Sequence, residues 1–494
     1  MAINTNNAYA YSNCFYGSSL RLKNKKRIRR YFNTLVFNAC SFLRFFYHRT
    51  NIGKILSSSC TTSYYTFSSS FLFFEGGRLT KKKNNNMNNS KKILVITPSL
   101  PFPPTGAEQA DRAYGISGLK NLGYEVKVVV KLVEWQTPEY VKEVGQKLGV
   151  EIIPVPYKFS NRTLTRKDRI KKIMLKLSNP LLLDGAALEY AEPEIKRVLK
   201  QELRVWRPNI VWFDYTYLWP LYGIVRKQKI PIITRSINYE PVHFLQEDGY
   251  TLFNLLKSAP KFFSEFLSSI KSTHVFAITP KEEKIYKRMN KQASVLPLRS
   301  LPYCLKKSHP INDKKTLNVF FMGSTYNVSH NRKALEFILK EIAPFMSKHH
   351  PNQFLFYILG KKVPENYNEF FKDNVIYKGP LYGNELESFL LNIDLALVPS
   401  FFGAGMQQKI FEPLARGIPT ITSKRGIADY PFKDRTHVYF AKNKADFINC
   451  LLELRDVTKR KKLSQESINL ASKLFSMQII SQAIRTAINK LLKT

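Results

Sequence analysis

The sequence predicts an α/β protein made of two doubly wound domains that face a cleft, preceded by an extension without regular structure. Short apolar runs alternate with longer helical patterns, which is typical of a parallel sheet covered by helices. The pattern begins at Lys91, stops in a Pro- and Lys-rich stretch, and begins again near residue 310. The chain has 494 residues, and single cores usually stop growing at about 250–300 residues, so two domains are expected.

The first predicted domain covers residues 91–300. It opens with the buried strand Ile93–Ile96, a Pro/Gly loop and a helical stretch that Gly123 ends. Similar apolar runs predict its other strands: Val126–Val130, Ile152–Val155, Ile210–Phe213, Ile230–Thr234 and Val275–Ile278.

The second predicted domain covers residues 308–475 and follows a linker at Ser300–Lys315. Helices such as Lys333–Ser347 separate its strands. Residues 476–494 form a last helix that we expect to pack back on the first domain. The predicted strands are Leu317–Met322, Phe354–Leu359, Val375–Tyr377, Leu395–Val398 and Pro419–Thr422.

Residues 1–90 differ in composition from the rest of the chain. They hold 14 Lys/Arg and one acid, Glu75, and no apolar period that could build a core. This predicts a disordered basic, Ser- and Asn-rich extension. A misplaced start is the preferred explanation, since Met87 stands just before the first strand, and an organelle transit peptide, which has this composition, is the alternative. Without a transit peptide the expected location is cytoplasmic.

Charge and cysteines exclude several classes of protein. The net charge is +40, and residues 91–494 contribute 63 basic and 36 acidic groups. No RNP-like run, zinc finger or basic zipper accompanies the charge, so we expect no nucleic-acid partner. The five cysteines lack CxxC spacing and His partners, which indicates neither a zinc site nor a disulfide framework. No metal site is expected.

The stretch Phe402–Pro419 is the strongest chemical signal in the sequence. Gly403 and Gly405 stand between a predicted strand and a helix, which places free N–H groups and a positive helix end where anions and nucleotides bind. Lys409 and Glu412 share a face of that helix. Lys409 would meet phosphate and Glu412 would hold ribose hydroxyls, although an exposed ion pair between the two is the alternative.

Several segments in series carry a resemblance to a known family. Arg235–Glu240 and Asp394–Ser400 are two of them, and the opening strand before Thr105-Gly106-Ala107-Glu108-Gln109 is a third. Together they resemble glycosyltransferase family 4, the group 1 glycosyl transferases of the GT-B fold with two Rossmann-like domains. The resemblance covers essentially all of residues 91–494.

The resemblance implies roles for individual residues. Gly106 would lie in the acceptor loop and Gly323 at the opening strand of the donor domain, while Leu381 and Tyr382 would flank the base. The second glutamate of the family's Glu-x7-Glu motif falls on Glu412.

The sequence departs from the family at four points, and the first is Ala107 in place of the usual second glycine of the acceptor loop. The first glutamate of the motif is replaced by Ala404, and a histidine of the first domain is replaced by Ile237. The family's Arg–Lys pair beside the diphosphate aligns with Arg332 or Lys333 only after a shift. His243 lies close to the place of the lost histidine and could act as a catalytic or substrate-binding imidazole, or be a structural histidine.

The resemblance implies transfer of a sugar from a nucleotide diphosphate to a glycan or lipid-linked acceptor, with retention and without an obligatory metal. The donor is a co-substrate, so no bound cofactor is expected, and the activity would serve polysaccharide biosynthesis of the cell envelope. Lys409 and the N–H groups near Gly405 would stabilise the departing diphosphate. A GT-B sugar epimerase and a non-catalytic sugar- or lipid-binding relative are the alternatives, since Ala404 and Ile237 replace family residues.

A basic amphipathic helix is predicted at residues 162–177. Ile170, Ile173, Met174 and Leu177 share one face, and six Lys/Arg surround it. Such a helix can lie on an anionic membrane, which would make the protein peripheral. A helix that faces the core and carries cations outside fits the same pattern.

Overall fold

The computed structural model describes residues 91–493 apart from 105, 133–135 and 157–164. Contacts divide the chain into two units, Met1–Asn86 and Met87–Thr494, and the second holds all the described elements. The predictions for residues 1–90, and for the first part of the basic helix, lie outside the described residues.

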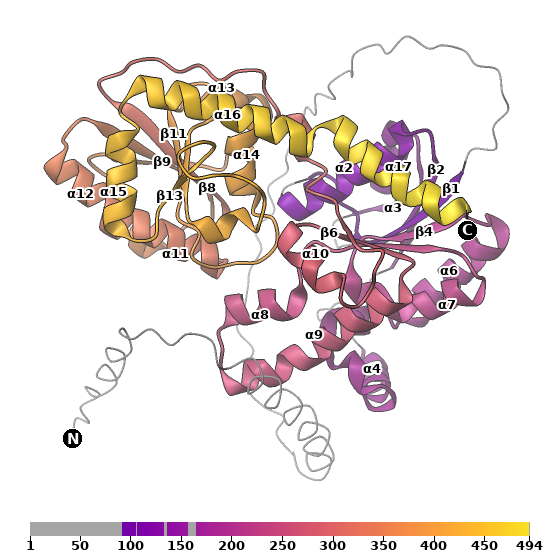
Figure 1. Ribbon diagram of the computed structural model, residues 1–494. Coiled ribbons are helices and arrows are strands. Elements are labelled where there is room, and N and C mark those ends of the chain that lie inside the picture. The colour runs from indigo at the N-terminus through magenta and orange to yellow at the C-terminus, as the bar shows by residue number, and fades with distance from the viewer. Residues whose placement is uncertain (1–90, 105, 133–135, 157–164, 494) are drawn as a thin grey trace, which may run out of the picture. The chain divides into compact units, whose positions relative to one another are not determined.

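The described part of the first domain forms a seven-stranded sheet in the order β3-β2-β1-β4-β5-β6-β7, with all neighbours parallel (Figure 1). Its central strands consist almost entirely of buried side chains, as expected for a parallel sheet covered on both faces. The strands are β1 (Lys92–Ser99), β2 (Glu125–Lys131), β3 (Glu151–Val155), β4 (Ile210–Phe213), β5 (Ile232–Arg235), β6 (His274–Ala277) and β7 (Ser294–Val295).

Helices connect these strands. They are α2 (Ala107–Asn121), α3 (Pro138–Leu148), α4 (Arg166–Ser178), η2 (Pro180–Leu183), α5 (Gly185–Glu189), α6 (Pro193–Val205), η3 (Thr216–Leu221), α7 (Tyr222–Lys227), α8 (Glu240–Asp248), α9 (Leu252–Lys271), α10 (Pro280–Tyr286) and η4 (Leu301–Cys304).

The second domain has a six-stranded sheet in the order β10-β9-β8-β11-β12-β13, again parallel. Its strands are β8 (Leu317–Thr325), β9 (Phe354–Lys361), β10 (Val375–Gly379), β11 (Leu395–Val398), β12 (Thr420–Thr422) and β13 (Tyr439–Phe440). Its helices are α11 (Ser329–Phe337), the π-turn η5 (Ile338–Ile342), α12 (Ala343–His349), η6 (Glu365–Phe370), α13 (Gly383–Leu390), α14 (Gln408–Arg416), η7 (Lys424–Ile427), α15 (Lys444–Glu453) and α16 (Val457–Phe475).

Two parallel, doubly wound sheets confirm the predicted fold class. In each sheet the strand order reverses once, between β1 and β4 in the first and between β8 and β11 in the second. Ligands of such sheets bind beyond the carboxyl ends of the strands at this switch point. The reversals therefore mark where each domain's ligand should lie.

The predicted linker packs against the second domain. Leu301 and Cys304 of η4 are buried, and the Lys306 N–H donates to the Ala415 carbonyl over 3.2 Å. His309 Nε2 lies 2.7 Å from the Ile393 carbonyl oxygen. The segment therefore joins the two domains and is hydrogen-bonded to the second one.

The chain crosses between the domains again at its end. Helix α16 contacts α14 of the second domain, and α17 (Met477–Lys493) follows after a break at Ser476. Ile480, Ile484 and Ile488 of α17 are buried in the core cluster that contains β1 and β2 of the first sheet (Figure 1). The last helix thus completes the core of the first domain.

Candidate functional site

The predicted donor residues follow the two strands that flank the second switch point. Gly323 lies near the end of β8, and Gly405 and Lys409 lie in the loop and helix that follow β11. A Cβ atom built on Gly323 would lie 3.0 Å from the Tyr326 ring. The backbone of β8 is therefore packed closely at this edge of the sheet.

Gly405 occupies a position that other residues could hardly adopt. Its φ angle is +69°, and a Cβ atom there would lie 2.2 Å from Asn238 Oδ1 and 2.8 Å from the Ile237 carbonyl oxygen. Its N–H, which we predicted to face a diphosphate, donates to Glu282 Oε1 over 3.2 Å. That carboxylate also accepts from the Tyr239 N–H at 3.1 Å. The N–H of Gly405 in the donor loop is therefore hydrogen-bonded to a carboxylate of the first domain.

Glu282 is a buried acid at this junction. Burial raises its pKa to about 7, against the lowering effect of its two backbone donors. Its Oε2 atom is buried and has no hydrogen-bond partner among the described residues. The sequence analysis did not single out this residue, because nothing local marks a glutamate in the first turn of α10 as a partner of a distant loop.

Lys409 lies in the first turn of α14 and is held by the second domain. Its Nζ donates to Asn331 Oδ1 over 2.7 Å and lies 5.7 Å from the centre of the Phe321 ring. Burial lowers the pKa of Lys409 to about 7, and the carboxylate of Glu247 opposes that shift. Asn331 Nδ2 donates in turn to the Thr325 carbonyl, which fixes the amide that receives the ammonium group.

Glu412 points to different partners from Lys409. Its Oε1 accepts from Arg416 Nε and Nη2 at 3.0 and 2.8 Å, and its Oε2 accepts from Gln408 at 2.9 Å. Among the described residues no ion pair joins Lys409 to Glu412, so the alternative of a simple exposed pair is wrong. Their predicted roles toward phosphate and ribose stay predictions.

The predicted base-flanking residues follow β10 at the same edge of the sheet. Leu381 is partly buried against the core, while Tyr382 precedes α13 and exposes 46% of its surface. Lys361 Nζ lies 5.2 Å from the centre of the Tyr382 ring. The ring is thus open to stack with a planar group.

In the first domain the predicted residues lie on two different elements. Gly106 precedes α2, and a Cβ atom there would meet open space. His243 lies on α8, and its Nδ1 is buried without a hydrogen-bond partner among the described residues. Ile237, which replaces the family's histidine, is buried in the main hydrophobic cluster.

Contacts between α8 and the second domain were not predicted. His330 Nδ1 lies 2.5 Å from Glu247 Oε1, and Arg425 Nη2 donates to Gln246 Oε1 over 2.5 Å and to the Gly403 carbonyl. Burial would raise the pKa of Glu247, but the bond to His330 brings it below its ordinary value. Burial lowers the pKa of His330, so the pair is a carboxylate with a neutral imidazole near neutral pH.

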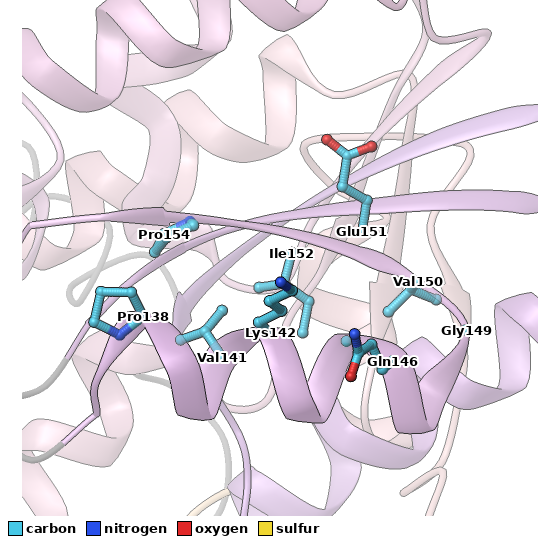
Figure 2. Close-up of a pocket in the computed structure, with 10 residues that line it drawn as sticks. Pro138, Val141, Lys142, Gln146, Gly149, Val150, Glu151, Ile152 and Pro154 are labelled. Carbon is cyan, nitrogen blue, oxygen red and sulfur yellow. The ribbon is translucent and has the colours of Figure 1, made fainter.

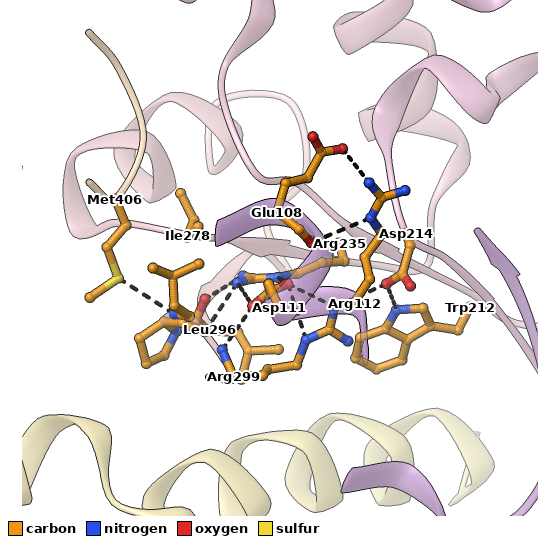
Figure 3. A network of polar contacts seen from close by, with 12 residues as sticks. Glu108, Asp111, Arg112, Trp212, Asp214, Arg235, Ile278, Leu296, Arg299 and Met406 are labelled. Carbon is orange, nitrogen blue, oxygen red and sulfur yellow. Dashed lines mark hydrogen bonds and ion pairs between the residues drawn. The ribbon is translucent and has the colours of Figure 1, made fainter. Parts of the chain in front are cut away.

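A buried polar network lies beside this junction (Figure 3). Asp111 accepts from Arg235 Nη2 at 3.2 Å, and from the Arg299 backbone N–H and Nη2 at 2.8 Å each. Arg299 Nη2 also reaches Asp214 Oδ1 at 3.2 Å, and Trp212 Nε1 donates to the same oxygen at 2.8 Å. The network joins α2 and the ends of β4 and β5 to the chain that leaves β7.

The network is connected to the donor loop through one contact. The N–H of Leu298, next to Arg299, donates to Met406 Sδ over 3.4 Å (Figure 3). Met406 directly follows Gly405 and is also 3.6 Å from the Tyr430 hydroxyl. The buried ion pairs therefore support the segment against which the donor loop packs.

The hollow in Figure 2 is a different feature. It has a volume of about 590 Å³ and lies between α3 and the edge strand β3, from Pro138 to Pro154. It contains none of the predicted site residues. Across the described ranges, no group of three His, Cys, Asp or Glu side chains is placed to hold a metal ion.

The two switch points, with the candidate residues after β8 and β11, define a GT-B architecture. Residues 316–456 match the family model of glycosyl transferases group 1, which confirms the predicted resemblance to that group over this part of the second domain. A comparison with the sequences of curated proteins finds no match.

Solved structures share the fold. Sucrose-phosphate synthase from Thermosynechococcus elongatus is 13% identical, with a TM-score of 0.57 over 82% of this chain and 99% of that one. TarM of S. aureus is 12% identical, with a TM-score of 0.58 over 81% and 99%. HepE of Anabaena, solved in complex with UDP, is 12% identical, with a TM-score of 0.56 over 81% and 100%.

Proposed function

We propose that this protein is a retaining glycosyltransferase that moves a sugar from a nucleotide diphosphate to a glycan or lipid-linked acceptor, without an obligatory metal. The observation that carries the proposal is the ammonium group of Lys409, which Asn331 holds beside the β8–β11 switch point. A fixed cation at this edge suits a departing diphosphate, whose negative charge grows as the sugar–phosphate bond breaks. The structural neighbour HepE was solved with UDP and with UDP-glucose, which supports the same class of donor.

A screen tests the reaction itself. Several nucleotide sugars, each offered with glycan and lipid-linked acceptors, should yield one glycosylated product by mass spectrometry, with the anomeric configuration of the donor. Addition of EDTA should leave the rate unchanged. Product formation would argue against a non-catalytic sugar- or lipid-binding relative, and epimerised nucleotide sugar in place of product would favour the epimerase.

Donor binding should depend on pH through Lys409. Because its pKa is about 7, the free protein loses the charge of this side chain as the pH rises above 7. A diphosphate binds the charged form, so the affinity for UDP should fall with rising pH above 7, by at most about tenfold per pH unit. Lys409→Arg should remove this dependence because guanidinium stays charged. Titration calorimetry from pH 7 to pH 9 measures it, and equal slopes for both proteins would contradict it.

Substitution of His243 should separate a chemical role from a structural one. We expect His243→Ala to lower turnover more than UDP affinity, because α8 belongs to the first domain, where the acceptor should bind, while the nucleotide sits on the second. Turnover and the dissociation constant of UDP are the two measurements. Normal specific activity with a lowered melting temperature would instead show a structural histidine.

The acceptor side includes α4. Ile170, Ile173, Met174 and Leu177 are each more than half exposed, and no residue of this helix is buried. The alternative of a core-facing apolar side is therefore wrong for these four residues. We propose that α4 lies on an anionic membrane surface, where lipid-linked acceptors reside, with Lys171 and Lys172 beside the lipid headgroups.

A further inference from the structure

Helix α9 has its polar side toward the protein and its apolar side outward. Its buried residues are Ser264, Glu265, Ser268 and Ser269. Ser264 bonds to Asp184 at 2.7 Å, and Glu265 accepts from Tyr286 at 2.7 Å and from Thr216. A surface helix of a globular protein normally buries its apolar stripe, so this orientation is inverted.

The outward side of α9 is a continuous apolar stripe. Its members follow one another at helical spacing along nearly the whole helix, and Leu252 is the most exposed of them at 73%. They are Leu252, Leu255, Leu256, Phe263, Phe266 and Ile270. Exposed apolar surface of this extent marks an interaction site in a folded protein.

The stripe and α4 belong to the same side of the first domain. Both helices contact η2, whose Leu183 exposes 47% of its surface. We call the exposed apolar side chains of α4, η2 and α9 the α4–α9 surface.

The positive charge of this surface favours an anionic partner. Helix α9 carries Lys257, Lys261 and Lys271 and a single acid, which is buried, whereas α4 carries six Lys/Arg and the single acid Asp168. Asp168 accepts from the Thr165 hydroxyl in a helix cap. A second copy of this surface would bring the same cations, and residues 1–90 hold 14 basic residues and one acid, so both would be repelled.

We propose that the α4–α9 surface is a membrane-docking face, in which the α9 stripe enters the acyl region of an anionic bilayer while the basic residues of α4 and the exposed Lys257 of α9 meet its headgroups. The inference extends the proposed contact of α4 and rests on it for the kind of partner. No described helix is long and apolar enough to cross a membrane. The stripe supplies the apolar contact and α4 the larger share of the charge.

Vesicle binding of the full chain tests the proposal. The triple variant Leu252→Ser, Leu256→Ser, Phe263→Ser should bind vesicles of phosphatidylcholine with phosphatidylglycerol at least about tenfold more weakly than the parent, because three apolar side chains no longer enter the bilayer. The double variant Leu391→Ser, Ile479→Ser is the matched control, since both side chains are exposed but lie on other elements. Equal binding of the triple variant and the parent would overturn the proposal.

A photo-crosslinking residue gives a second readout that needs no loss of binding. With benzoylphenylalanine at position 256, illumination beside these vesicles should give lipid adducts, whereas position 391 should give none. Adducts to residues 1–90 or to a second copy of the chain would identify another occupant and overturn the proposal.

Two further measurements separate the contribution of α4 from that of α9, and membrane binding from transferase activity. Lys171→Ala with Lys172→Ala should also weaken binding to anionic vesicles and leave binding to pure phosphatidylcholine unchanged. If only this pair weakens binding, α4 docks and the α9 inference fails. Hydrolysis of nucleotide sugar without acceptor reports on the transferase site in every variant, so its loss would concern the proposed reaction alone.

Discussion

Replacing Lys409 with alanine should lower turnover about a hundredfold while the protein stays folded. Removal of one preorganised donor to developing charge typically costs about 3 kcal/mol in the transition state, because no water reorganises in time to replace it. The side chain is held by Asn331, and the alanine variant loses one hydrogen bond of the ground state, worth about 1–3 kcal/mol. Turnover at saturating donor and the melting temperature are the two measurements.

An exposed helix pair supplies the control for Lys409. Lys340 bonds to Glu336 at 2.6 Å in an i,i+4 pair on the same domain, and such pairs are worth about 0.3–0.5 kcal/mol. Lys340→Ala should leave turnover unchanged. Near-normal turnover of Lys409→Ala with the correct donor would show that the proposed site is wrong.

Glu412, which was predicted to hold ribose hydroxyls, also has a structural role in the second domain. Its carboxylate holds Arg416, which is buried and otherwise pairs with Glu387 at 2.7 Å. Glu412→Ala should therefore lower stability as well as nucleotide affinity, because it removes a buried charge partner. Glu412→Gln keeps an oxygen that can accept hydrogen bonds from Arg416 and from a ribose hydroxyl. This variant therefore tests nucleotide binding with a smaller loss of stability than Glu412→Ala.

Replacing Asp111 with alanine should destabilise the protein by about 3–5 kcal/mol, because the buried guanidinium group of Arg235 loses its carboxylate and that of Arg299 keeps only Asp214. Chemical denaturation measures the loss. Glu143→Ala removes the partner of Lys147 in an exposed pair and should change stability by less than about 0.5 kcal/mol. Similar stability of Asp111→Ala and the parent would contradict the assigned role of the network.

The Asp111 carboxylate should also make the stability of the protein depend on pH in the acid range. Burial would raise the pKa of Asp111, but the two arginines hold it well below its ordinary range. A depressed folded-state pKa contributes stability that is fully present above the unfolded pKa of about 3.9 and is lost as the pH falls below it. The parent should therefore lose stability more steeply below pH 4 than Asp111→Asn does.

The central strands were predictable because each is a short apolar run buried on both faces, whereas the two-residue edge strands β7 and β13 were not predicted. The predicted runs Ile93–Ile96 and Leu395–Val398 lie in β1 and β11. The helix predicted at Lys333–Ser347 begins at Ser329 and contains the π-turn η5, since helical periodicity does not reveal a local change of hydrogen-bond register.

The candidate site was predictable only where a local pattern marks it. Gly405 and Lys409 follow a strand and open a helix, which is visible in the sequence. Glu282 and Arg425 were missed because their partners lie in the other domain, at separations that no periodicity reports. The apolar stripe of α9 shows the opposite limit: a periodic pattern defines a face but does not say whether that face is buried.

The packing of α17 on the first sheet implies an order in which the two domains complete their folding during synthesis. A ribosome makes β1 before the second domain and α17 after it, yet Ile484 and Ile488 share one core with Ile93 and Val95. Domains usually fold as they emerge, N-terminal first. Here the second domain, with its own core, can close while the first still exposes the apolar groove that α17 fills. The domain whose strands are translated first is therefore completed only after the second domain has been made.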